Sequence, residues 1–377
     1  MGRMEKVYQF LRPLSIIFFL ISFIWLSKAF LLGSYPDFKT QYYVPQIVFN
    51  GGDPYKGGFS LFTPQVYPPT EFLFFIPFSL VSLSVSSILY TAFSFISFYL
   101  SLYLLAKTFE IKFFSITNLF LMGFASLMFP AKFTLGMGQI NMFVLLLLSL
   151  CLFSLKKNKL FVSGIWMGLS LVIKMFPPIL LMYFLLKPNK KLLFGLAITI
   201  LISGFFTIIF IPLDVIKSFF EVLPSLLNSW KLDYYNQAMS GFVGRSFGTG
   251  TLAQLIKNML SLILVGSVIV VVIRNIKKDF FTIALIFGTL INLNVIVNTF
   301  SWQHHFVWLI IPLYATFVYL QKNKKGVGGF LFLGMSYILI SLNLKTPEVF
   351  PLLLQSHVLF GSIILLLLNL HLLKRKF

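Results

Sequence analysis

Carboxylate side chains are scarce in this chain, which has ten Asp and Glu among 377 residues. Seven of them fall in segments that share one predicted side of a membrane, namely Asp37, Asp53, Glu71, Asp214, Glu221, Asp233 and Glu348. A carboxylate beside a membrane can act as a general base when other polar groups complete its site. Because charged residues are costly near lipid, their grouping on one side predicts chemistry there.

Asp37 is the first candidate for such a base. It follows Pro36 at the start of the first long segment between apolar runs, before residues that can form an amphipathic helix in the membrane interface. The same position also suits an N-cap, which needs no catalytic role. Asp53 precedes Pro54, is typical of a turn, and is the second candidate for the base. Glu71 can cap a helix or pair locally.

Polar residues also interrupt the apolar runs. Gln139 and Asn141 begin a predicted helix. Lys174 lies in the run SLVIKMFPPILL, so its ammonium group either extends to the outer lipid headgroups or pairs with an anion. Pro177 and Pro178 predict a broken helix that lines a cavity, because backbone carbonyls freed by proline must face protein or water.

Two more groups of candidates come later in the chain. The stretch DYYNQAMSGFVGR offers the amides of Asn236 and Gln237. It ends in Arg245, which either binds a phosphate through two N–H groups or is an ordinary surface arginine. His304 and His305 are adjacent at the outer end of an apolar run. Neighbouring side chains point in different directions on a helix, so we do not expect the two histidines to share a metal.

The elements that must position these residues are membrane-spanning helices. Hydrophobic residues make up 58% of the chain, and the mean hydropathy is +0.92. We expect an all-α polytopic membrane protein with about 10 to 12 crossings, several of them shorter than the ~20 residues of a straight span. The apolar runs cover 13–32, 83–105, 113–130, 139–155, 160–173, 175–186, 192–211, 251–273, 279–298, 306–321, 327–343 and 352–373. We expect the first run to be a membrane anchor and not a cleaved signal peptide.

The basic residues predict the orientation of these helices. Most of the 30 Lys and Arg fall on the side opposite the carboxylates. By the positive-inside rule that side is cytoplasmic, which places both termini inside and the segments 34–82 and 212–250 outside. The net charge of +20 then reflects orientation and contact with anionic lipid, and we expect no nucleic-acid partner. The single Cys151 lies in an apolar run, which predicts neither a disulfide framework nor a cysteine metal site.

The order of the motifs is more specific than any one of them. D-F-x-x-x-Y-Y begins at Asp37 and is followed by G-G-D-P-Y, Y-P-P, G-Q-x-N, a lysine before proline, and N-Q-x-x-x-G-x-x-x-R. Over roughly 35–310 this order resembles the polyprenol-phosphate-mannose-dependent mannosyltransferases of glycosyltransferase family 87, a group with the GT-C fold. The pattern departs from the family at Ala238, where a serine commonly follows the two amides.

The resemblance implies a single GT-C-like transmembrane domain over 1–377 in the cell membrane. It implies transfer of a sugar, with mannose as the default, from a polyprenyl phosphate carrier to a hydroxyl of a glycan or glycolipid on the outer face. Asp37 matches the family's general base, and His304 or His305 matches its outer-face histidine.

The remaining candidates follow from the chemistry of such a transfer. We expect Lys174 and Arg245 to face the donor phosphate, since cations stabilise a departing phosphate. The sugar or acceptor is expected to contact Gln139, Asn141, Asn236, Gln237 and Tyr42. The charge of the donor rests on one phosphate, so no metal or other cofactor is required.

A secondary transporter or lipid flippase is the alternative function. Many spans, broken helices and both termini on one side fit that class well. Transporters usually gather their polar residues near the middle of the membrane, whereas here they cluster at the outer boundary. That placement favours an enzyme.

Overall fold

The computed structural model describes residues 3–57, 59, 61–175, 178–229, 232–275, 279–323 and 326–374. Throughout this part of the chain the regular structure is helical, and a single isolated β-bridge joins Asn236 to Trp302. The expectation of an all-α protein is confirmed.

Six helices among the described residues are long and apolar enough to cross a membrane. They are α1 (Arg3–Leu32), α4 (Leu83–Thr108), α10 (Lys190–Phe210), α13 (Thr251–Asn275), α14 (Phe280–Val297) and α18 (His357–Lys374). Shorter apolar helices are α7 (Asn141–Lys156), α8 (Leu160–Lys174) and α16 (Val327–Ser341). The predicted run 113–130 is not straight, because α5 (Ile116–Leu127) and α6 (Phe129–Met137) meet at an angle of 54°. The polytopic architecture is confirmed.

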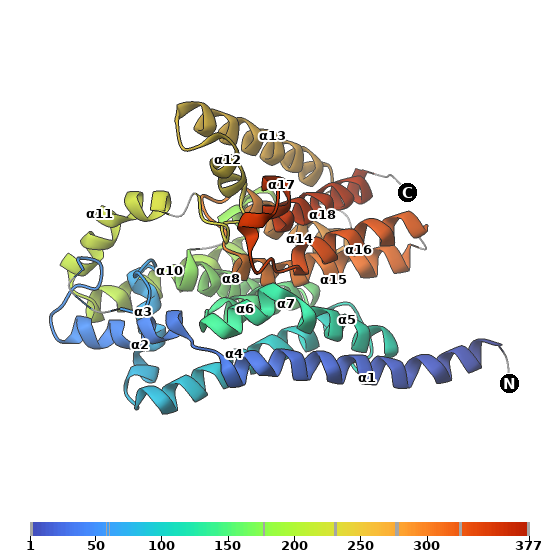
Figure 1. The fold of residues 1–377 in the computed structure, drawn as a ribbon, viewed down its shortest axis with the longest axis horizontal. Helices are drawn as coiled ribbons and strands as arrows, with labels where there is room; N and C mark the ends of the chain where they lie inside the picture. Colours follow the sequence, from blue (N-terminus) through green and yellow to red (C-terminus); the bar gives the residue numbers. More distant parts are fainter. Residues whose placement is uncertain are drawn as a thin grey trace.

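The two long segments expected outside the membrane also fold into helices. The first contains α2 (Pro36–Phe49) and α3 (Pro69–Ser79), and the second contains α11 (Leu213–Ser229) and α12 (Met239–Phe247). The remaining elements are η1 (Pro178–Leu180), α9 (Leu181–Leu186), η2 (Gln303–Leu309), α15 (Ile310–Lys322), η3 (Pro347–Val349) and α17 (Leu352–Gln355). The start of α1 and the end of α18 lie at one end of the molecule, and α2, α3 and α11 lie at the other (Figure 1).

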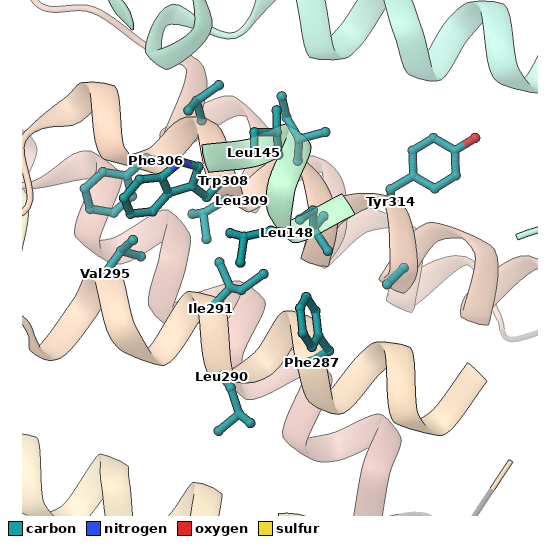
Figure 2. Packing of buried hydrophobic residues seen from close by; sticks show 14 of the residues in the cluster. Leu145, Leu148, Phe287, Leu290, Ile291, Val295, Phe306, Trp308, Leu309 and Tyr314 are labelled. Atoms are coloured by element: carbon teal, nitrogen blue, oxygen red, sulfur yellow. The ribbon is translucent and has the colours of Figure 1, made fainter. Parts of the chain in front are cut away.

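The core surrounds α14. Its side chains Phe287, Leu290, Ile291 and Val295 are fully buried, and Figure 2 shows Ile291 and Val295 on the side of α14 that faces residues of α7 and η2. Trp308 of η2 is also fully buried, and its indole N–H donates to the backbone oxygen of Asn141 at 3.0 Å. This bond fixes η2 against the start of α7. Both elements carry candidate site residues, so the core holds the site in place.

Other helices turn apolar side chains outward. Leu201 and Phe205 of α10 and Leu262 of α13 are largely exposed, although all three are large hydrophobic residues. An apolar surface of this extent is unfavourable in water and suits contact with lipid. The outer faces of α10 and α13 therefore fit the predicted membrane environment.

Candidate active site

A glycine brings α2 close to the start of α7. Helix α6 ends at Gly138, whose backbone is left-handed with φ 71°. A Cβ at this position would lie 2.6 Å from Cβ of Phe38, so the close approach of α2 requires glycine. The approach sets Asp37, the neighbour of Phe38, beside Gln139, the neighbour of Gly138.

Asp37 lies in the first turn of α2 and not at its cap. Tyr35 is the N-cap residue, and it makes no side-chain capping bond. The side chain of Asp37 accepts a hydrogen bond from Nε2 of Gln139 and is only 8% exposed. The capping interpretation of Asp37 is therefore wrong. Burial raises the pKa of Asp37, and hydrogen bonds and the charge of Lys174 oppose that rise.

Gln139 connects the carboxylate to a buried cation. Its Nε2 donates to Asp37, and its Oε1 accepts hydrogen bonds from Lys174 Nζ at 2.8 Å and from the Tyr67 hydroxyl at 2.5 Å. Lys174 Nζ also donates to Oδ1 of Asn141 at 2.6 Å. The orientation of the Gln139 amide is thus fixed by a negative group on one side and a positive group on the other.

Lys174 is buried at the end of α8. Its side chain is 8% exposed, and its Nζ lies 5.0 Å from the centre of the Tyr67 ring. The alternative in which this lysine extends to lipid headgroups is therefore wrong. The helix ends here because Met175 adopts a left-handed conformation with φ 40°, and η1 begins at Pro178. The predicted break at Pro177 lies outside the described residues.

Five of the predicted site residues line one cavity of about 360 Å³. These are Asp37, Gln139, Lys174, His304 and His305. Apolar side chains complete the wall, among them Phe219, Leu223 and Leu226 of α11, together with Met137, Phe300 and Trp302. The cavity thus combines a carboxyl group, a lysine and hydrogen-bonding groups with an apolar wall.

The two histidines enter the cavity from η2. Their ring centres are 4.4 Å apart, so both rings reach the same space although they are adjacent in sequence. Nδ1 of His305 accepts a hydrogen bond from the backbone N–H of Trp302 at 3.0 Å. This bond places the proton of a neutral His305 ring on Nε2. No group of three or more His, Cys, Asp or Glu in the described residues is placed to hold a metal ion.

Burial lowers the pKa of both histidines well below the ordinary value, and the charge of Lys174 lowers each further. Both rings are consequently neutral at physiological pH. A neutral ring can donate or accept a hydrogen bond but cannot supply a positive charge. Among the described residues that line this cavity, the cation is Lys174.

Arg245 does not line the cavity. Its Nη1 donates to the backbone oxygens of Asp233 and Asn236 at 2.7 and 2.9 Å, and its Nη2 donates to Oγ of Ser356 at 2.7 Å. Burial lowers the pKa of Arg245 to about 10, so the guanidinium remains charged at neutral pH. In this arrangement the arginine holds the segment before α12 against α17.

Asn236, Gln237 and Tyr42 also lie outside the cavity wall. Oδ1 of Asn236 accepts the backbone N–H groups of Ala238 and Ser301. Nε2 of Gln237 donates to backbone oxygens in the loop before α12 and in α17. The Tyr42 hydroxyl donates to a backbone oxygen after α3. The structure therefore engages all three in holding segments of the chain together through backbone contacts.

Asp53 and Glu71 have different surroundings. Asp53 accepts the backbone N–H of Tyr55 at 3.0 Å, which confirms the predicted turn, and it does not line the cavity. Glu71 is fully buried in the first turn of α3, near Lys174 and Asp37. Sequence reasoning missed Tyr67 as a residue that lines the cavity, and it missed the burial of Glu71 behind the cavity. The Y-P-P motif, which starts at Tyr67, was the signal available.

The fold is that of a polytopic helical membrane protein, and a buried carboxyl group and a buried lysine line one cavity in it. Residues 66–293 match glycosyltransferase family 87, which is more than half of the chain. The protein belongs to this family and is a membrane glycosyltransferase. No curated protein matches the chain. The family favours the enzyme over the transporter and flippase alternative.

Proposed function

We propose that this glycosyltransferase moves a sugar, with mannose as the default, from a polyprenyl phosphate carrier to a hydroxyl of a glycan or glycolipid acceptor. One observation carries the proposal. Asp37 and Lys174 reach the same apolar-walled cavity and are separated by the amide of Gln139. A base is therefore held at a short distance from a cation, as transfer from a phosphate leaving group requires.

The reaction is a single displacement. The carboxylate of Asp37 takes the proton of the acceptor hydroxyl, and the acceptor oxygen attacks the anomeric carbon of the sugar. The bond from that carbon to the phosphate oxygen breaks, and the phosphate leaves with one additional negative charge. Lys174 stabilises this charge, and a neutral histidine donates a hydrogen bond to it. Attack from the far side inverts the anomeric centre.

Helix α11 supports a lipid-linked donor. It lines the cavity with Phe219, Leu223 and Leu226, while Leu213 and Phe220 on its outer face are 59% and 61% exposed. Such a helix suits the membrane interface, where exposed apolar side chains contact acyl chains. An isoprenoid carrier can then lie along α11 with its phosphate inside the cavity.

The orientation in the membrane is part of the proposal. We place both termini in the cytoplasm and the cavity on the outer face, in a GT-C-like architecture in the cell membrane. Cysteine labelling of intact cells tests this after replacement of the buried Cys151. Position 56, an exposed lysine after the turn at Asp53, is expected to react from outside. Labelling of position 56 from the cytoplasmic side alone would reverse the orientation.

Transfer itself is tested with purified protein in liposomes. The donors are polyprenyl-phosphate-mannose and GDP-mannose, and the read-out is the labelled product and its anomeric configuration. We expect transfer from the lipid donor alone, with inversion. Asp37→Asn should reduce the rate about 100-fold or more, because it removes the base. Asp53→Asn is the matched control and should keep the rate. Transfer by Asp37→Asn at the normal rate would exclude Asp37 as the base.

A further inference from the structure

Glu71 is a buried carboxyl for which the proposed reaction gives no role. It lies in the first turn of α3 and is 0% exposed. The neighbouring Thr70 donates from Oγ1 to the backbone oxygen of Val172 at 2.6 Å, which holds this turn against the end of α8. Glu71 does not line the cavity, so it lies behind the site and not in it.

No group among the described residues compensates a charge on Glu71 directly. Neither of its carboxyl oxygens has a hydrogen-bond partner there, and it forms no ion pair. An ionised carboxylate without hydrogen bonds is strongly disfavoured in a buried position. Asp37 differs, because it accepts a hydrogen bond from Gln139 and faces the cavity.

The charges near Lys174 also disfavour an ionised Glu71. One buried lysine faces two carboxyls, Asp37 and Glu71, so full ionisation would leave a net negative charge. Two like charges in one buried site do not both ionise readily, and one proton remains with the pair. The carboxyl with the poorer surroundings keeps it. Here that carboxyl is Glu71.

We propose that Glu71 holds the shared proton of a carboxyl pair beside Lys174 and thereby leaves Asp37 ionised as the base. Glu71 is thus a positioning residue that acts through Asp37. The effect of Glu71 on catalysis rests on the proposed function, whereas the protonation state of Glu71 does not. With the proton on Glu71, Lys174 balances Asp37, and the donor phosphate enters a site without excess negative charge. When Asp37 accepts the acceptor proton, Lys174 is available to the departing phosphate.

All groups that face Glu71 fit this assignment. Among the described residues, the titratable side chains that interact electrostatically with Glu71 are Asp37 of α2, Tyr55 and Tyr67 of the loop before α3, Tyr90 of α4 and Lys174 of α8. The same elements also carry Lys39, Tyr42 and Tyr43 on α2 and Tyr99, Tyr103 and Lys107 on α4, and α11 carries the exposed Asp214, Lys217 and Glu221. On α10, the charged residues Lys190 and Lys191 lie in its first turn. Burial raises the pKa of Glu71, Lys174 opposes this, and Asp37 adds to it. A raised pKa favours the protonated form of Glu71, in agreement with its lack of hydrogen-bond partners among the described residues.

Infrared spectroscopy of the protein in liposomes tests the assignment without any substrate. We expect a protonated-carboxyl C=O band at pH 7 that shifts in D2O. The band should be lost in Glu71→Gln and retained in Asp37→Asn. Glu348→Gln is the matched control, because Glu348 is exposed, and it should leave the band unchanged. A wild-type protein without the band, or a band lost in Asp37→Asn and kept in Glu71→Gln, would overturn the proposal.

The transfer assay gives an independent result. Glutamine has the shape of the protonated carboxyl and carries no charge, so Glu71→Gln should keep transfer within a few-fold of wild type. Loss of transfer in a folded Glu71→Gln protein would show that a negative charge is needed there and would refute the proposal. If the wild type transfers no sugar from the lipid donor, the proposed function fails, and the infrared result still decides the protonation of Glu71.

Discussion

Asp37 and Lys174 belong to one site but do not touch. The amide of Gln139 lies between them, donating from Nε2 to Asp37 and accepting from Lys174 Nζ at 2.8 Å. No direct ion pair joins the two among the described residues. A direct pair would lower the basicity of Asp37 and occupy Lys174, whereas the amide bridge leaves each group available to a substrate.

The bridge can be removed without adding charge. Gln139→Leu is expected to lower the free energy of unfolding by about 1–3 kcal/mol, because Asp37 loses its donor and Lys174 loses an acceptor. Transfer should fall more than stability alone explains, since both groups lose their orientation. Thermal unfolding and initial rates measure the two effects. Gln46→Leu is the control, because it removes a single hydrogen bond to Ser79 outside the cavity, and it should keep transfer. Equal rates for both variants would contradict the role of the bridge.

The pH dependence of transfer follows from the state of Asp37 and the histidines. The pKa of Asp37 is raised by burial, so this carboxyl group becomes ionised at a pH above the ordinary Asp pKa of about 4. Transfer should therefore rise with pH through this shifted value. His304 and His305 have lowered pKa values and stay neutral, so titration of these two rings is not expected to reduce the rate as pH passes about 6.5. Initial rates across pH at saturating donor measure this. A fall in rate near that pH would instead indicate that a cation in the site, either Lys174 or a histidine, loses its proton there.

Substitution of Gly138 tests how the position of α2 affects transfer, without changing a reacting group. Gly138→Ala places a Cβ in a left-handed conformation and within 2.6 Å of Phe38, so α2 must move from Gln139. The backbone strain alone costs about 1–3 kcal/mol. We expect lower thermal stability and reduced transfer.

Two glycines separate the causes of that effect. Gly57→Ala introduces a comparable backbone strain, with φ 77°, but meets no atom within 4 Å. Gly136→Ala meets no atom within 4 Å and does not require positive φ. Both should keep transfer. If Gly57→Ala reduced transfer as much as Gly138→Ala, the approach of α2 would not be the cause.

Substitution of Arg245 tests whether this residue has a structural role or binds the donor phosphate. Arg245→Ala should lower stability by about 1.5–3 kcal/mol, because the charged guanidinium donates to backbone oxygens and to Ser356. Donor affinity of the folded protein should change little. Lys217→Ala, at an exposed position, is the control for loss of charge. Unchanged stability with weakened donor binding would support the phosphate contact that the sequence suggests.

The class of the protein and its local elements could be predicted from the sequence. Apolar composition and run lengths specify membrane helices, because a long apolar segment has no stable place in water. The helix after Asp37 and the turn at Asp53 were also predictable, since both depend on neighbouring residues. The unusual position of Lys174 in an apolar run pointed to a site, because an isolated charge there needs a partner.

Which of these residues meet depends on how the helices pack, and the sequence could not predict it. Asp37, Gln139, Lys174 and His305 come from α2, the α6–α7 junction, α8 and η2, and no local pattern fixes contacts across such separations. The same packing engages Arg245 with backbone oxygens and buries Glu71 behind Lys174. Residue type shows what a side chain can do, whereas burial and the partners available in the fold select one of those possibilities.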